Sequence, residues 1–217
     1  MKCPRILLVS NPLIGSRIVL PLVWLAMVAG VSMAMVFYAA TPGPADSAPK
    51  HWPSDSRISP AGGISNLIVF VHPHCPCSRA TIGELEILLA ESHRTVSAQV
   101  WFIHPKGTPN DWTKTALWRT ASAIPGVTVH EDHDLTESRR FHVDTSGQAL
   151  LYDSEQNLLF QGGITISRGH AGPNPGRDAL TALLKNFQLA PFPVSGPVYG
   201  CPLVEEIPEN GGSQCRR

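Results

Sequence analysis

The sequence of 217 residues lacks net charge and has few charged residues. Lysine and arginine total 17, aspartate and glutamate also total 17, and charged residues make up 16% of the chain. A protein that follows a phosphate backbone needs a basic surface, so this balance argues against nucleic acid as a partner. Apolar residues make up 43% of the chain, which excludes a disordered protein. We therefore expect a globular domain of ordinary size.

Motifs of several common enzyme classes are also missing. The sequence has no glycine-rich phosphate loop and no serine in a hydrolase-type elbow. Its five cysteines are too few for a small protein held together by disulfides. The positions of these cysteines are therefore more informative than their number.

One long hydrophobic run lies near the N-terminus. Ile18 to Ala40 spans 23 residues without a charge, enough for a helix to cross about 30 Å of hydrocarbon. Basic residues are slightly more numerous before the run than after it, with Lys2, Arg5 and Arg17 against Lys50 and Arg57. This predicts a signal-anchor that passes once through a membrane, with residues 1–17 in the cytoplasm and the C-terminal domain exported. A cleaved signal peptide and a buried core helix are the alternatives.

The remaining chain divides by composition. Residues 41–63 are rich in proline and glycine and predict a flexible linker. Residues 64–203 predict the folded domain, and residues 204–217 predict a mobile tail.

Strand and helix patterns alternate within the folded domain. Strands are expected at 66–72, 96–103, 126–131, 148–152 and 158–160, and helices at 78–92, 111–124, 135–141 and 176–187. Asp111 is the expected cap of the second helix, Asn174 caps the last, and Thr81 with Glu84 has the spacing of a capping box in the first. This order predicts an α/β fold, with a central mixed sheet and helices on both faces.

Cys75-Pro76-Cys77 lies between the first strand and the helix that follows it. Reactive groups in open α/β sheets gather beyond the carboxyl ends of the strands. Unpaired N–H groups and the helix dipole lower the pKa of a thiol at such a place. Because the thiolate is the nucleophile in disulfide exchange, we expect Cys75 to attack a substrate sulfur and Cys77 to resolve the mixed disulfide.

The single residue between the two cysteines predicts a small, strained disulfide ring. Strain makes a disulfide easier to reduce, so we expect an oxidising or isomerase-like couple. Two buried, inert thiols or a permanent bridge are the alternatives. A pair that stays oxidised would make the protein a non-catalytic adaptor.

A metal site is another alternative reading of the same segment. His72, His74, Cys75 and Cys77 offer two imidazoles and two thiolates, which suit copper(I) or zinc. Neighbouring residues at the end of a strand point to opposite sides, which makes it hard for all four to converge.

The segment NLIVFVHPHCPCSRATIGEL resembles the first strand, active-site turn and first long helix of thioredoxin-fold proteins. Residues 111–160 resemble the membrane-anchored, periplasm-facing branch related to TlpA and the peroxiredoxins. The turn together with GGITISRGH and VYGCPL is similar to the thioredoxin-like RedB proteins. The resemblance covers about residues 60–203. It implies a thiol–disulfide oxidoreductase that acts on protein thiols or disulfides without a cofactor, or, as in other thioredoxin-fold proteins, a copper(I) carrier.

The sequence departs from the thioredoxin pattern at two places. One residue is missing between the cysteines, and the segment expected to face them, Thr145 to Gln148, lacks the cis-proline of thioredoxins. Ser146 and Gly147 are expected to take that place, where glycine would let a substrate backbone come close.

The other cysteines allow several arrangements. Cys201 is either a third redox thiol near the turn, a partner of Cys215 or a free thiol, and the sequence does not choose. Cys3 should stay reduced on the cytoplasmic side.

Several further residues could support a site or only the fold. Arg168 and His170 lie in a glycine-rich loop expected at one end of the sheet. His130 and His133 flank two acidic residues, a pattern that fits a metal cluster less well than a solvated strand end with a helix cap. Three tryptophans are expected to fill the core, namely Trp101, Trp112 and Trp118.

Overall fold

The computed structural model describes residues 12–92, 96–186 and 193–203. The chain forms two compact units, Met1–Ala39 and Ala40–Arg217. In the first, α1 (Pro12–Ala40) includes the apolar stretch Ile18–Ala40.

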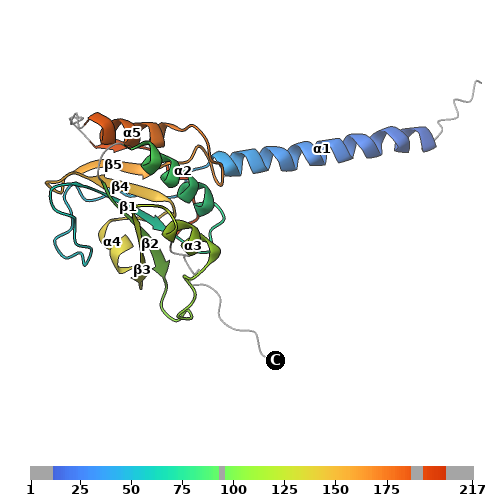
Figure 1. Cartoon of the computed structure of the whole chain (residues 1–217). Helices are drawn as coiled ribbons and strands as arrows, with labels where there is room; N and C mark the ends of the chain where they lie inside the picture. The colour runs from blue at the N-terminus through green and yellow to red at the C-terminus, as the bar shows by residue number, and fades with distance from the viewer. Residues whose placement is uncertain (1–11, 93–95, 187–192, 204–217) are drawn as a thin grey trace, which may run out of the picture. The chain divides into compact units, whose positions relative to one another are not determined.

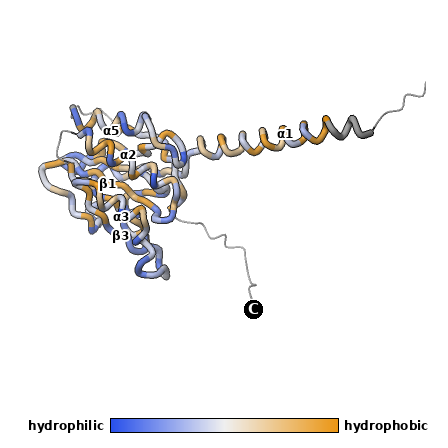
Figure 2. Tube along the Cα trace, turned by 45° about the vertical axis from the view of Figure 1, so that its right-hand side comes forward, coloured by the Kyte–Doolittle hydropathy of each residue, from blue (hydrophilic) through white to orange (hydrophobic). Residues whose placement is uncertain are grey.

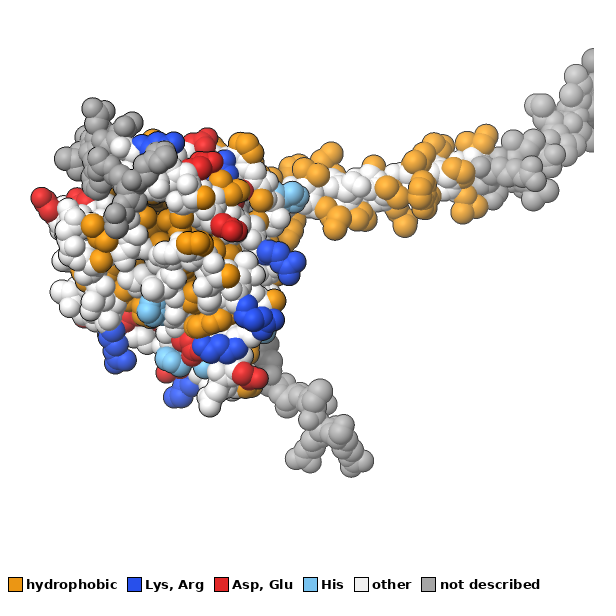
Figure 3. All heavy atoms as spheres, viewed as in Figure 1, with side chains coloured by type: hydrophobic (Ala, Val, Ile, Leu, Met, Phe, Trp, Pro, Cys, Tyr) orange, Lys and Arg blue, Asp and Glu red, His pale blue; other side chains and the backbone are white. Residues whose placement is uncertain are grey.

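None of the apolar stretch of α1 is buried inside the protein. Hydrophobic residues lie all along this helix (Figure 2), and their side chains cover its described part (Figure 3). A helix that is apolar on every side and exposed has the length and composition to cross a membrane. The core-helix alternative is therefore wrong.

The second unit is built on a six-stranded mixed sheet (Figure 1). Its strands are β1 (Ser65–Val71), β2 (Val96–His104), β3 (Val127–His133), β4 (Gln148–Tyr152), β5 (Leu158–Gly163) and β6 (Val194–Ser195). The strand order is β3-β2-β1-β4-β5-β6. β1, β2 and β3 run parallel, whereas β4 runs antiparallel to both β1 and β5. This topology, with helices on both faces, confirms the thioredoxin-like fold class. The sequence did not predict the two-residue strand β6.

The alternation of side chains along β1 builds the two halves of the core. All seven residues of β1 are buried. Leu67, Val69 and Val71 pack with α2 (Ser78–Glu91), α3 (Ala116–Ser122) and α5 (Pro175–Asn186). Ile68 and Phe70 pack on the opposite face, where α4 (Thr136–Arg140) lies. A central strand buried on both faces gives the turn that follows it a rigid base.

The segment predicted as a flexible linker is a folded part of the domain. Trp52 and Ile58 are buried in the core half beside Phe141, and the Trp52 indole N–H donates to the Ile58 carbonyl at 3.0 Å. The N–H of Gly43 also donates to the carbonyl of Val198 at 2.8 Å. The prediction failed because it relied on the proline and glycine content of the segment. The few large apolar residues in it, which pack against one face of the sheet, were given too little weight. The predicted tail, 204–217, lies outside the described residues.

Two predicted helix caps are wrong, and one is confirmed. The helix expected from Asp111 begins at Ala116, where the Thr115 hydroxyl accepts a hydrogen bond from the Trp118 N–H. Glu84 does not complete a capping box, because its buried carboxylate accepts hydrogen bonds from the α5 side of the domain. Asn174 caps α5 as predicted: its side-chain oxygen accepts from the Arg177 N–H at 2.8 Å.

Candidate thiol site

The two cysteines of the predicted motif lie in a tight turn between β1 and α2. The N–H of Cys75 donates to the His72 carbonyl at 3.1 Å, and the N–H of Ser78 donates to the Cys75 carbonyl at 3.2 Å. α2 begins at Ser78, and Cys77 makes no side-chain capping hydrogen bond. The turn therefore leaves the sulfur atom of Cys77 free of a helix-capping role.

A third sulfur joins these two. The sulfur atoms of Cys75, Cys77 and Cys201 all lie within 4.8 Å of one another. Cys75 and Cys77 are buried, Cys201 is half-buried, and all three are free thiols. Of the arrangements that the sequence left open for Cys201, the structure shows the one beside the turn, without a bridge. Cys215 lies outside the described residues.

A backbone contact with the loop before β4 positions Cys201. The N–H of Ser146 donates to the Cys201 carbonyl at 2.9 Å, and Thr145 and Pro202 form an antiparallel bridge. Gly200 makes the approach possible, because a Cβ at this position would lie 1.8 Å from the Ser146 carbonyl oxygen. The glycine directly before Cys201 was the one sequence feature that could have indicated this close approach.

The surroundings of Cys75 stabilise its thiolate. Burial acts to raise the pKa of Cys75, but hydrogen bonds from the Cys201 side chain and backbone, the Ser78 hydroxyl and the Cys77 backbone N–H outweigh it. The pKa of Cys75 therefore lies below the ordinary value for a thiol. A lowered pKa is a property that an attacking sulfur needs, and the role of Cys75 stays a prediction.

The other two thiols keep their protons more firmly. Burial and the neighbouring Cys75 raise the pKa of Cys77. Burial, the hydrogen bond to Cys75 and the charges of both other sulfurs raise the pKa of Cys201 to about 12. Arg168 acts in the opposite direction on both groups. The cluster therefore carries its first negative charge on Cys75.

Arg168 lies near the sulfurs, whereas His170 contacts its own loop. The guanidinium of Arg168 donates to the carbonyls of Gly200 and Thr41, the latter at 3.0 Å. The His170 ring nitrogen Nδ1 lies 2.7 Å from the Arg168 carbonyl, and the ring is exposed. Arg168 thus brings a positive charge to the segment that carries Cys201.

Ser146 and Gly147 support the turn in a way that the sequence did not predict. The Ser146 hydroxyl accepts a hydrogen bond from the His72 N–H at 2.8 Å and lies 2.7 Å from the Ser78 hydroxyl. Gly147 has a φ of +91°, and a Cβ there would lie 2.7 Å from the Thr81 hydroxyl. The contact with Thr81 explains the glycine from the fold itself, and the approach of a substrate backbone to Gly147 stays a prediction.

The two histidines of the predicted metal set contact Trp112 and are not part of the three-sulfur cluster. His74 Nε2 lies 3.0 Å from the Trp112 carbonyl, and the His74 backbone N–H donates to His72 Nδ1 at 3.1 Å. Both rings pack against the Trp112 ring, with centroid distances of 5.2 Å for His72 and 4.8 Å for His74. Among the described residues, the donor atoms that cluster at this turn are the three sulfurs.

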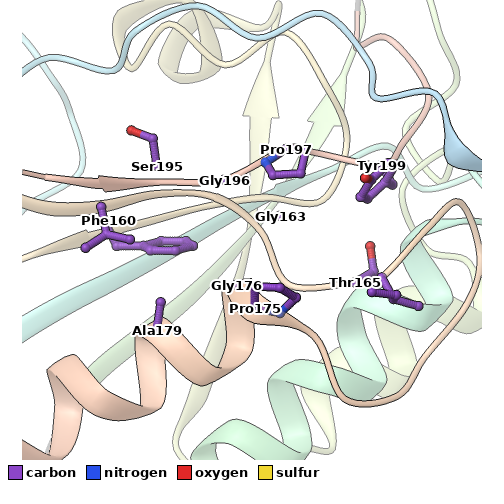
Figure 4. Close-up of a pocket in the computed structure, with 12 residues that line it drawn as sticks. Phe160, Gly163, Thr165, Pro175, Gly176, Ala179, Ser195, Gly196, Pro197 and Tyr199 are labelled. Atoms are coloured by element: carbon purple, nitrogen blue, oxygen red, sulfur yellow. The ribbon is translucent and has the colours of Figure 1, made fainter.

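A shallow depression gives access to Cys75. Its volume is about 250 Å³, and its lining includes Cys75, Pro76, His74 and Arg79 together with Thr115 and Leu117. A second cavity, of about 230 Å³, lies between β5, β6 and α5, and none of its lining residues is a cysteine (Figure 4). Of these two, the first depression is the one that Cys75 lines.

Solved structures resemble this chain, whereas no protein-family model and no curated protein matches it. An uncharacterized conserved protein from Geobacillus kaustophilus has a TM-score of 0.53 and 16% identity, covering 78% of this chain and 93% of that chain. A hypothetical protein from Sinorhizobium meliloti has a TM-score of 0.45 and 16% identity, covering 76% and 92%. A secreted disulfide oxidoreductase from Mycobacterium tuberculosis, homologous to E. coli DsbE, has a TM-score of 0.41 and 14% identity, covering 57% and 81%. At these identities the likeness shows the fold alone.

Proposed function

We propose that this protein is a thiol–disulfide oxidoreductase in which Cys75 is the nucleophile and Cys77 the resolving thiol. The observation that carries the proposal is the hydrogen bonding of Cys75, which favours its thiolate over the thiols of Cys77 and Cys201. A sulfur that ionises before its two neighbours, at the end of a buried strand, is suited to disulfide exchange.

The reaction consists of two sulfur displacements. The Cys75 thiolate attacks a substrate disulfide, forms a mixed disulfide and releases one substrate sulfur as a thiolate. The Cys77 thiol then loses its proton and attacks the Cys75 sulfur, which releases the second substrate sulfur. The substrate gains two electrons, and Cys75 and Cys77 lose two as they form a disulfide. The reverse sequence oxidises a substrate dithiol.

The proposal includes a location and a family branch. The apolar span of α1 would hold the domain at the bacterial inner membrane, with the thiol site in the periplasm, where disulfides form and persist. The resemblance of residues 111–160 to the membrane-anchored, periplasm-facing branch related to TlpA favours the same location. The turn together with GGITISRGH and VYGCPL favours the RedB proteins as the family branch. Protein thiols and disulfides are then the substrates.

The test is mass spectrometry after alkylation, with the full chain in detergent equilibrated across a series of glutathione redox ratios. Cys75 and Cys77 should exchange between two thiols and one disulfide. The Cys77→Ser variant should accumulate a mixed disulfide on Cys75, and the Cys75→Ser variant should lose turnover of a protein disulfide. Thiols that stay reduced at every ratio would contradict the proposal.

Copper(I) carriage is a second candidate, favoured by the three-sulfur cluster. A trigonal site with metal–sulfur bonds of about 2.3 Å places its sulfurs about 4.0 Å apart, which the spacing in this protein can accommodate. Thiolates are ligands that suit copper(I). The ligands would then be Cys75, Cys77 and Cys201, in place of a set that includes His72 and His74.

Anaerobic titration of the reduced protein with copper(I) separates the two functions. A carrier should hold one equivalent, lose affinity in the Cys201→Ser variant and keep it in the His74→Gln variant. Glutathione should then fail to bring Cys75 and Cys77 into a disulfide while copper(I) is bound.

A further inference from the structure

Two histidines and a glutamate converge on neighbouring parallel strands, away from the three cysteines. His104 is the last residue of β2, and His133 pairs with it as the last residue of β3. Glu131 lies two residues before His133 and therefore on the same face of β3. The ligand atoms of these three side chains all lie within 4.8 Å of one another.

One carboxylate oxygen faces both imidazole rings. Oε2 of Glu131 lies 3.1 Å from His104 Nδ1 and 3.5 Å from His133 Nε2. Two ligands that each bind zinc at about 2.0–2.1 Å with tetrahedral geometry lie about 3.3 Å apart. The two measured separations bracket that value. The longer of them also exceeds an ordinary N–H···O hydrogen bond.

The other carboxylate oxygen has a separate set of partners. Oε1 of Glu131 accepts a hydrogen bond from the Thr113 hydroxyl at 2.9 Å and lies 2.5 Å from Lys114 Nζ. These contacts fix the orientation of the carboxylate and leave Oε2 for the histidines. A fixed outer partner of this kind is typical of carboxylates that bind metals.

Burial separates the roles of the two histidines. The His104 side chain is 8% exposed, and its ring stacks on Trp112 with a centroid distance of 6.3 Å. The His133 side chain is 70% exposed. A buried ligand on one side and an open position on the solvent side would let an ion enter and keep water or another ligand.

We propose that His104, Glu131 and His133 form a binding site for a divalent transition metal ion of the zinc type. Two imidazoles and one carboxylate are a donor set that zinc accepts with a fourth position left to water. The site is independent of the thiol chemistry, since none of its ligands is a cysteine.

The rest of the His130–Asp134 segment has other roles. His130 stacks on Trp101 with a centroid distance of 4.6 Å. Asp132 is buried and accepts hydrogen bonds from the backbone N–H groups of Glu137 and Ser138 at the start of α4. The metal site and the helix cap predicted for this segment thus involve different residues. Glu131 and His133 are the metal ligands, Asp132 binds the start of α4, and His130 is not a ligand.

The competing explanation for the convergence of these side chains is a network of ion pairs that binds no metal. Substitution of Lys114 distinguishes this network from a metal site. In a simple ion-pair network, Lys114 is the partner that neutralises Glu131. At a metal site the ammonium group repels the incoming cation. The Lys114→Gln variant should therefore bind metal at least as tightly as the wild type, and Thr113 would still hold Oε1.

Cobalt(II) and zinc titrations of the full chain in detergent test the proposal. Cobalt(II) replaces zinc and reports its ligands, since thiolate ligands add intense charge-transfer absorption that imidazole and carboxylate ligands do not. The triple Cys75→Ser, Cys77→Ser, Cys201→Ser variant removes the thiol ligands, so that metal binding at the histidine–glutamate site is measured alone. Circular dichroism checks that this variant is folded. Zinc affinity is measured by competition with a coloured chelator.

The matched pair of variants is His133→Gln and His130→Gln, two histidines on opposite faces of β3. His133→Gln should weaken zinc binding at the thiol-free site by at least about tenfold, whereas His130→Gln should leave it unchanged. The cobalt spectrum of the triple cysteine variant should show bands without thiolate absorption.

Equal affinity in His133→Gln and wild type would overturn the proposal, as would cobalt binding that shows only thiolate absorption in the wild type. If the triple variant is unfolded, the His133→Gln and His130→Gln titrations in the wild-type background decide the question.

Discussion

The backbone N–H of Ser146 donates a hydrogen bond to the carbonyl of Cys201, 55 positions along the chain, at 2.9 Å. This contact places a third thiol beside the Cys75-Pro76-Cys77 turn and occupies a backbone group that a substrate strand could otherwise use. The C-terminal segment of the domain is thus part of the thiol site. A substitution in this segment can therefore move Cys201 away from the turn while all three sulfur atoms are kept.

Replacing Gly200 with alanine should displace Cys201 from the turn. The added Cβ would lie 1.8 Å from the Ser146 carbonyl oxygen, so the segment must move. Crowding of this kind costs about 1–3 kcal/mol of unfolding free energy, which urea denaturation measures. The matched control is Gly196→Ala, where an added Cβ would meet nothing within 4 Å. Equal stability of the two variants would show that the close approach of Gly200 to Ser146 does not contribute to the unfolding free energy.

The pH dependence of alkylation should identify Cys75 as the thiolate. Its pKa lies below the ordinary value for a thiol, so its alkylation rate should reach half of its maximum at a lower pH than that of an unperturbed cysteine. Removal of the Cys201 hydrogen bond in a Cys201→Ala variant should move that midpoint to higher pH. His170→Gln, in an exposed loop, should leave it in place. Peptide mapping assigns the alkylated cysteine, and a midpoint that does not shift in Cys201→Ala would contradict the hydrogen-bond explanation.

The Cys75–Cys77 couple should be more oxidising than thioredoxin. Hydrogen bonds that stabilise the Cys75 thiolate favour the reduced state, and the small disulfide ring disfavours the oxidised state. We expect a reduction potential above the thioredoxin value of about −270 mV. Equilibration with glutathione followed by alkylation gives the potential. A value at or below that of thioredoxin would show that neither the stabilised thiolate nor the small disulfide ring sets the reduction potential.

Loss of Arg177 should destabilise the junction between α2 and α5. Its guanidinium lies 2.6 Å from a carboxylate oxygen of Glu84, which is fully buried. An uncompensated buried charge costs about 3–5 kcal/mol, so Arg177→Ala should lower the unfolding free energy by an amount of that order. Arg119→Ala, at an exposed position of α3, should change it little. Denaturant unfolding compares the two, and recovery of stability in the Arg177→Ala, Glu84→Gln double variant would assign the loss to the buried charge.

The local patterns of the sequence determined the order of strands and helices, the apolar span of α1 and the location of the cysteine turn. A short apolar run rich in β-branched residues, such as β1, favours the middle of a sheet, and a turn after it lies at the carboxyl edge. Asn174 followed by Pro175 likewise indicated the start of α5. These predictions succeeded because each depends on neighbours in the chain.

Only the tertiary structure decided which distant residues meet. Cys201 reaches Cys75 because the chain turns back along Ser146, and His104 reaches Glu131 because two parallel strands share a register. Residues 41–63 look like a linker by composition, yet Trp52 fills one face of the sheet. Apart from Gly200 before Cys201, the sequence carries no local mark of these contacts, because their free energy comes from packing and hydrogen bonding between segments that are close only after the sheet has formed.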